Sequence, residues 1–173
     1  AIENMVVETK KILDPQNIKL PLLDNIKVGN SLISGAEKQL KKYFGKDYQD
    51  KKPFNWDEEF KEVFDQSGFD VIIGNPPWVE SRKFSVGDKN FYSRLYSTAT
   101  GQYDLFNLFI ERSISLLKEG GILGFIVPDR FVTNLDYTPV RRFLLEHFSV
   151  REIVVVGEGV FEGVQMPSAI LIL

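Results

Sequence analysis

A run of apolar residues that ends in two prolines constrains the fold of this chain more than any other feature. Residues 69–73 are mostly apolar and lie between two glycines, which is typical of a strand buried on both faces. Asn75, Pro76 and Pro77 follow and cannot continue a strand, because proline lacks an N–H donor and has a fixed φ. The sequence therefore predicts a stiff loop at the carboxyl end of a buried strand, where open α/β sheets bind ligands. We expect the Asn75 amide and the Trp78 ring to project from it.

Composition excludes several kinds of site. The chain has no cysteine and one histidine, which excludes disulfides, thiolate zinc sites, a cysteine nucleophile and a histidine-based metal cluster, so we expect no metal. The net charge of −3 argues against a surface that binds nucleic acid throughout, although it permits a local basic patch. No apolar run approaches the ~20 residues of a membrane span and no signal peptide opens the chain, so we expect a cytoplasmic protein without membrane contact.

Strands and helices are predicted to alternate along the chain. Periodic apolar residues indicate helices at 1–14, 37–44, 58–64, 102–118 and 138–148. Short apolar runs indicate strands at 25–28, 69–73, 122–127, 151–156 and 168–173. Asp57 and Thr138 are the expected N-caps of two helices. Only a loop separates the last two strands, so the predicted fold class is α/β, with a mostly parallel sheet and an antiparallel last strand.

Two polar stretches each admit two interpretations. Residues 79–101 are polar, basic and aromatic without clean periodicity. Their composition favours a solvated surface loop over a mobile segment that meets a polyanion through side chains such as Arg82 and Lys89. Asn30 and Ser31 follow a predicted strand, where they form either a turn and helix cap or a ligand contact. The residues alone favour the turn.

The loop at residues 75–78 also carries a family resemblance. Asn75-Pro76-Pro77-Trp78 after a strand resembles the catalytic motif of the DNA amino-methyltransferases that modify adenine at N6. Further motifs in the same order and spacing extend the resemblance over residues 25–173. They resemble those of the bacterial and archaeal type IIG restriction–modification methyltransferases, and they are Gly29-Asn30-Ser31-Leu32, residues 103–111, 116–121 and 125–128, and Val160-Phe161.

The resemblance implies a fold and a cofactor. The expected fold is the Rossmann-like sheet of S-adenosylmethionine-dependent methyltransferases, of which this chain forms the C-terminal part. The expected cofactor is S-adenosylmethionine, with Asn30 or Ser31 hydrogen-bonded to its adenine, the Phe109 ring beside that adenine, and Asn75 close to both cofactor and substrate. From the residues alone, Phe109 is almost as well explained as a core residue on an apolar helix.

The chemistry of the reaction explains the residues of the loop. The exocyclic amine of adenine is a poor nucleophile because its lone pair is delocalised into the ring. Two acceptors aimed at its N–H bonds, the Asn75 side-chain oxygen and the Pro76 carbonyl, would favour a more tetrahedral nitrogen, and the two prolines hold both acceptors in place. The target base has to flip out of the duplex. Trp78 offers a face on which it can stack, and Phe161 either closes the other side or packs within its own loop.

Parts of the family pattern are missing. The glycine-rich loop that grips the amino-acid part of the cofactor and the acidic residue that holds its ribose do not appear before Ile26. We therefore expect residues 1–173 to form a partial methyltransferase catalytic domain, its catalytic half, with little cofactor binding or activity alone. A target-recognition domain and any fused endonuclease are expected outside this sequence.

Other functions share this loop. Similar loops serve enzymes that methylate cytosine N4, protein glutamine or RNA guanine, because each target is a planar amine or amide. A methyltransferase-like module that only binds DNA, without catalysis, is a second class of function, and a plain structural domain is a third. The motif order favours adenine in double-stranded DNA.

Overall fold

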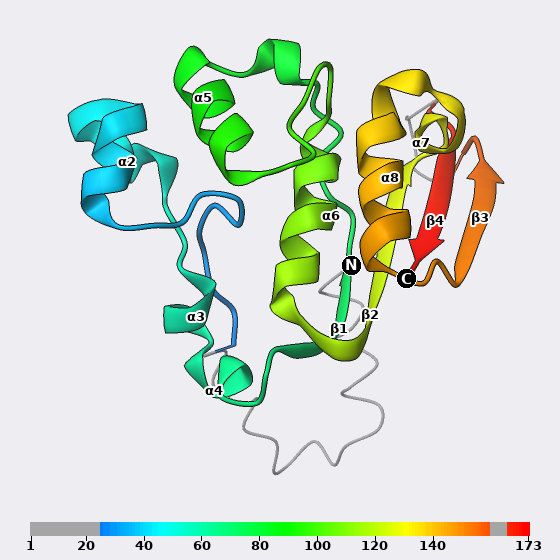
Figure 1. Ribbon diagram of the computed structural model, residues 1–173, viewed down its shortest axis with the longest axis horizontal. Coiled ribbons are helices and arrows are strands. Elements are labelled where there is room, and N and C mark those ends of the chain that lie inside the picture. The colour runs from blue at the N-terminus through cyan, green and yellow to red at the C-terminus, as the bar shows by residue number, and fades with distance from the viewer. Residues whose placement is uncertain (1–24, 160–165) are drawn as a thin grey trace, which may run out of the picture.

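The structure is a computed structural model that describes residues 25–159 and 166–173, and in these ranges it contains one four-stranded sheet (Figure 1). Strand β1 spans Phe69–Gly74, β2 spans Leu117–Pro128, β3 spans Glu152–Gly157 and β4 spans Ser168–Ile172. The order is β1-β2-β4-β3, with β1 parallel to β2 and β4 antiparallel to both of its neighbours. The α/β class and the antiparallel last strand are confirmed, although β4 makes two of the three strand pairs antiparallel.

Two long helices cover one face of this sheet. Helices α6 (Leu105–Leu116) and α8 (Thr138–His147) confirm the predictions for 102–118 and 138–148, with shorter ends (Figure 1). Their apolar faces share a core with the sheet, because both helices present buried side chains towards β2 and β4. Its buried members include Phe106, Ile110, Val140 and Leu144 from the helices and Leu123, Phe125, Val127, Ala169 and Leu171 from the strands.

The structure also describes further helical segments. They are α2 (Glu37–Phe44), α3 (Trp56–Glu59), α4 (Lys61–Phe64), α5 (Val86–Leu95), α7 (Arg130–Thr133) and 3₁₀ turns at Gly45–Lys51, Ser81–Lys83 and Leu135–Tyr137. Of these, α2 to α5 lie on the far side of α6 from β4 and β3 (Figure 1). Among the residues that the structure describes, no helix is long and apolar enough to cross a membrane. The helix predicted at 1–14 lies outside the described residues.

Helix α5 corrects the prediction for residues 79–101, which form neither a continuous surface loop nor an irregular segment. Ser85 caps this helix, because its Oγ accepts a hydrogen bond from the Asp88 N–H at 3.1 Å. Phe91 and Tyr92 are buried in a second core between α2, α5 and α6. The sequence pattern hid the helix because its buried side chains are large aromatic rings among basic residues, without the regular apolar spacing that indicates a helix.

The outer side of β1 differs from prediction. Val71 and Ile73 are exposed, Ile73 by 80%, so β1 is not buried on both faces. Residues 25–28 form no strand, and Val28 is 85% exposed. A strand needs a neighbour for its backbone hydrogen bonds, and the structure places no described strand beside the outer edge of β1.

Two predicted helix caps are also wrong. The helix predicted at 58–64 is divided at Phe60 into α3 and α4, and Asn55 rather than Asp57 precedes it. The Asn55 side chain is used elsewhere, because its Oδ1 accepts the Gly35 N–H at 3.0 Å. Helix α8 begins at Thr138 itself, with Pro139 in its first turn, where a missing N–H costs nothing.

Candidate active site

The sequence of strand, asparagine and two prolines places a rigid loop at the carboxyl end of β1. This strand ends at Gly74, and the loop then exposes Asn75 and Pro77 while it buries Pro76. Gly74 allows the backbone to pass close to the core, since a Cβ at this position would lie 3.2 Å from the Phe125 ring. The predicted stiff loop at the end of β1 is confirmed, and its asparagine side chain is accessible from outside.

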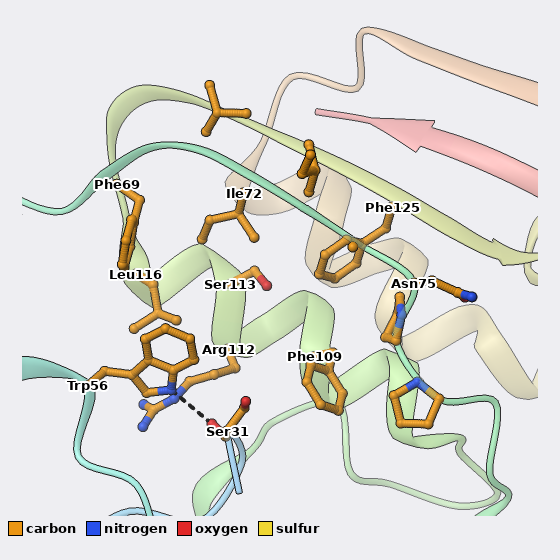
Figure 2. A pocket seen from close by; sticks show the side chains of 15 residues that line it. Ser31, Trp56, Phe69, Ile72, Asn75, Phe109, Arg112, Ser113, Leu116 and Phe125 are labelled. Atoms are coloured by element: carbon orange, nitrogen blue, oxygen red, sulfur yellow. Dashed lines mark hydrogen bonds between the residues drawn. The ribbon is translucent and has the colours of Figure 1, made fainter. Parts of the chain in front are cut away.

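A pocket of about 520 Å³ opens beside this loop, and we call it the β1 pocket (Figure 2). It brings together predicted site residues from three distant segments: Ser31, the loop residues 75–77, and Phe109 from α6. In Figure 2 the Phe109 ring lies between Ser31 and Asn75. The rest of its wall is mainly apolar and consists of Trp56, Phe69, Val71, Ile72, Ile73, Gly74, Arg112, Ser113, Leu116 and Phe125.

Asn30 and Ser31 make different contacts in the structure. The Asn30 Oδ1 accepts the Leu32 N–H at 3.1 Å, which is the turn contact expected for an asparagine here. Ser31 lines the β1 pocket, and its backbone carbonyl accepts a hydrogen bond from Trp56 Nε1 at 3.1 Å. Ser31 is therefore held at the pocket wall by Trp56, while Asn30 shapes the turn behind it.

Arg112 was not among the predicted site residues, although it is the only charged residue of the described ranges that lines the β1 pocket. Its Nη2 donates a hydrogen bond to Ser34 Oγ at 2.6 Å. Its Nε–H is buried and has no hydrogen-bond partner in the part of the chain that the structure describes. A sequence signal existed, because Arg112 follows Phe109 by three residues on the same helix face.

The chain after the prolines is tied to the start of α6. Leu105 donates its N–H to the Val79 carbonyl at 2.9 Å, and Ser81 donates its N–H to the Tyr103 carbonyl at 2.7 Å. Trp78 is half-buried, packs against the main core and does not line the β1 pocket. Phe161, the predicted second contact of the target base, lies outside the described residues.

A buried carboxylate lies where the chain after the prolines is hydrogen-bonded to the start of α6. Asp104 is 3% exposed, and its Oδ2 accepts hydrogen bonds from Arg130 Nη2 at 2.9 Å and from the Tyr137 hydroxyl at 2.8 Å. Burial, and then the bond to Asp104, raise the pKa of the Tyr137 phenol, so it stays a neutral donor. Sequence reasoning missed this network because its three members are up to 33 residues apart.

The electrostatic character of the site follows from these residues. Its loop presents an amide and a backbone carbonyl, and its pocket presents aromatic rings, the hydroxyls of Ser31 and Ser113, and the guanidinium of Arg112. Over residues 25–159 and 166–173, no three side chains of the metal-binding types gather together. The arrangement is suited to holding a planar, partly apolar ligand against Phe109 with its reactive end at Asn75.

Comparisons with known proteins find relatives of this chain among restriction–modification enzymes and methyltransferases. The type II restriction enzyme and methyltransferase RM.Eco57I of Escherichia coli is 34% identical over 154 residues, which cover 87% of this chain and 14% of the relative. The type II methyltransferase M.TthHB8I of Thermus thermophilus is 36% identical over 110 residues, covering 60% of this chain and 25% of the relative. A solved structure described as a class I S-adenosylmethionine-dependent methyltransferase, from Listeria monocytogenes, matches with a TM-score of 0.50 and 28% identity over 61% of this chain and 31% of that one.

The chain therefore spans between 14% and 31% of the length of these three proteins. Its fold is that of the S-adenosylmethionine-dependent methyltransferases, and fold and family together imply S-adenosylmethionine as the cofactor. A family model described as Eco57I restriction-modification methylase matches residues 7–161, which is most of the chain. The chain belongs to the Eco57I restriction-modification methylase family.

Proposed function

We propose that this chain is the catalytic part of a DNA methyltransferase that transfers a methyl group from S-adenosylmethionine to adenine N6 in a restriction–modification system. The observation that carries the proposal is the position of the loop at residues 75–77, at the rim of a pocket that also contains Ser31 and Phe109. Family membership and relatives that are named restriction enzymes and methyltransferases support DNA as the substrate.

The loop supplies two hydrogen-bond acceptors to the reaction. The Asn75 side chain is exposed and has no hydrogen-bond partner among the described residues, so its oxygen is available to an incoming N–H. The Pro76 carbonyl is the second acceptor. Together they draw both amine hydrogens away from the ring plane, which returns lone-pair density to the nitrogen. The two prolines fix the loop before substrate arrives, so little reorganisation is needed in the transition state.

The residues of the β1 pocket fit the cofactor. Its volume of about 520 Å³ is within the range of small-molecule sites. The Phe109 ring offers a face for the adenine, Ser31 a hydroxyl, and the buried, unpartnered Arg112 Nε–H a donor for a ring nitrogen. When bound, S-adenosylmethionine supplies a methyl group that its sulfonium has already activated. Asn75, at the rim, orients the amine towards that end of the pocket.

The target base requires a second binding surface. We place the flipped adenine against Trp78, because stacking of a base on an aromatic ring contributes about 1–3 kcal/mol. Phe161 is the proposed second face. Trp78 is half-buried against the main core, so its ring is already ordered and loses little entropy when a base binds.

Other targets remain as alternatives to adenine. Cytosine N4, protein glutamine and RNA guanine offer similar planar amines or amides to Asn75, and a non-catalytic DNA-binding module would retain the fold without turnover. We propose that residues 1–173 are only part of the catalytic domain, and that the remainder of the cofactor site, the target-recognition domain and any fused endonuclease belong to other parts of the full-length protein.

The test uses the full-length protein. It is incubated with labelled S-adenosylmethionine and mixed double-stranded DNA, and the DNA is digested to nucleosides for mass spectrometry. N6-methyladenine is the expected product. N4-methylcytosine would keep the mechanism and change the base, whereas unlabelled nucleosides from a protein that still binds the cofactor would overturn the proposal. An Asn75→Ala protein is the matched control for background labelling.

A further inference from the structure

A second depression lies next to the catalytic loop, and we call it the α5 groove. Helix α5 forms one side of it, and the segment after that helix forms the other. Its volume is about 400 Å³. Its walls are Ser81, Arg82, Lys89, Asn90, Ser93, Ala99, Gly101, Gln102 and Tyr103.

The α5 groove is close to the residues that are proposed to hold the target base. Ser81, which lines this groove, makes two hydrogen bonds with Tyr103. The Ser81 N–H donates to the Tyr103 carbonyl at 2.7 Å, and Ser81 Oγ accepts the Tyr103 N–H at 3.3 Å. Arg82 follows Trp78 by four residues, which span at most about 14 Å of extended chain. DNA rises about 3.4 Å per nucleotide on each strand, so the Arg82 end of the α5 groove lies within about four nucleotides of a base stacked on Trp78.

The charges in the α5 groove have one sign. Among the residues that the structure describes, Arg82 and Lys89 are its only ionisable wall residues apart from Tyr103, and no carboxylate lines it, although the chain as a whole carries a net charge of −3. Lys89 has no ion-pair partner in the described ranges. Arg82 pairs with Glu80, yet its side chain is 71% exposed and remains free to reach outward. The smaller pocket that shares Ser81 and Arg82 with this groove contains carboxylates as well, Glu80, Asp104 and Asp136, and two of them pair with Arg82 and Arg130.

Neutral donors complete the α5 groove. The side-chain amides of Asn90 and Gln102 make no hydrogen bond to any other described residue, and both are exposed at the wall. On helix α5, Ser93 follows Asn90 by three residues and Lys89 by four. This spacing places the three side chains along one side of the helix. Cations interleaved with amide donors are the usual partners of DNA phosphate oxygens.

We propose that the α5 groove binds the phosphodiester backbone of the DNA strand that carries the target base, with Lys89 and Arg82 as the charged contacts. The inference rests on the proposed function, and it assigns residues 79–101 a role in positioning DNA instead of in chemistry. Phosphate contacts fix the register of a protein on DNA without reading its sequence, so this surface would hold the strand while Trp78 and Asn75 act on the base.

The test measures DNA affinity of the full-length protein as a function of salt. A fluorescently labelled duplex is titrated with the wild type and with Lys89→Ala, Arg82→Ala and Lys61→Ala proteins. Lys61 is the matched control, because it is an exposed lysine on α4, at the end of the molecule away from α5 (Figure 1). Each lost phosphate contact should make the slope of log K against log[salt] shallower by about 0.9. When the salt is raised from about 50 to 200 mM, such a variant should lose about 3.5-fold less of its DNA affinity than the wild type does.

The expected result is a reduced slope and weaker binding to all sequences for Lys89→Ala and Arg82→Ala, with wild-type values for Lys61→Ala. Wild-type slopes in both groove variants would overturn the α5 groove proposal, and N6-methyladenine from the same proteins would show that the proposed function still stands. If wild-type protein labels a protein or RNA substrate and no DNA, both proposals fail.

Discussion

Replacing Asp104 by alanine should loosen the segment that follows the catalytic loop. The Asp104 carboxylate is buried and accepts hydrogen bonds from Arg130 and Tyr137. Its two chain neighbours hold the loop, because the Leu105 N–H donates to Val79 and the Tyr103 carbonyl accepts from Ser81. A cavity at Asp104 therefore acts directly on the segment that leads away from Trp78.

The expected free-energy change follows from what alanine leaves behind. The buried Tyr137 hydroxyl loses its acceptor, which costs about 1–3 kcal/mol. The Arg130 side chain is 36% exposed, so water can hydrogen-bond to its guanidinium when the carboxylate is gone. Loss of this ion pair therefore costs only about 0.2–1 kcal/mol of stability. A combined loss of about 2 kcal/mol from the free energy of local opening raises the fraction of molecules in which this segment is open about 30-fold.

Hydrogen–deuterium exchange of the full-length protein measures this opening at the relevant amides. We expect the Ser81 and Leu105 amides to exchange about 30-fold faster in Asp104→Ala, and less so in Asp104→Asn, which keeps one acceptor oxygen. Peptides from β3 are the internal control, since they lie at the opposite edge of the sheet. Equal exchange of the Ser81 and Leu105 amides in Asp104→Ala and wild type would refute the role of this carboxylate as an anchor.

Three further perturbations test other parts of the site. Asn75→Ala should lower the methylation rate at least 10²-fold, as loss of one transition-state hydrogen bond does. The temperature of thermal unfolding should stay unchanged, because the side chain is exposed. Normal turnover by this variant would refute the mechanism. Trp78→Ala should weaken the fluorescence response of a base analogue at the target position, and Trp78→Phe should restore it; an unchanged response in Trp78→Ala would exclude stacking. Burial raises the pKa of Asp88, but hydrogen bonds from Lys51 and Ser85 outweigh it and hold the pKa below 3.8. The carboxylate therefore stabilises α5 above pH 3.8, and this stability should be lost as the pH falls through the folded pKa, as amide exchange in α5 would reveal; an equal acid response of Asp88→Asn would contradict it.

The elements that the sequence predicted well are those whose limits are set by local chemistry. β1 stops where Asn75 and the prolines begin, and α6 and α8 carry apolar faces long enough to indicate a helix. The loop, Ser31 and Phe109 were assigned from motif order, and the structure places them around one pocket. Whether they bind cofactor and base stays a prediction.

The features that the sequence could not predict depend on contacts between distant residues. Helix α5 is stabilised by aromatic rings that meet α2, and nothing in the local pattern reveals that partner. Arg112 reaches Ser34, which is 78 residues away, and this bond holds the guanidinium at the wall of the β1 pocket. Residues 25–28 show the opposite error, because an apolar run indicates a strand even where no described neighbour pairs with it.

These long-range contacts determine how the catalytic loop is held. One end of the loop is fixed by β1, which pairs with β2 and passes over Phe125 at Gly74. The other end is fixed by backbone bonds to the start of α6 around Asp104. Between these anchors stand two prolines, which cannot relax by rotation about φ. A loop with both ends and its centre restrained keeps the Asn75 side-chain oxygen and the Pro76 carbonyl in position without help from a ligand. In the proposed reaction, the alignment of the amine would therefore depend on the chain, and the binding energy of the DNA would be left for flipping the base.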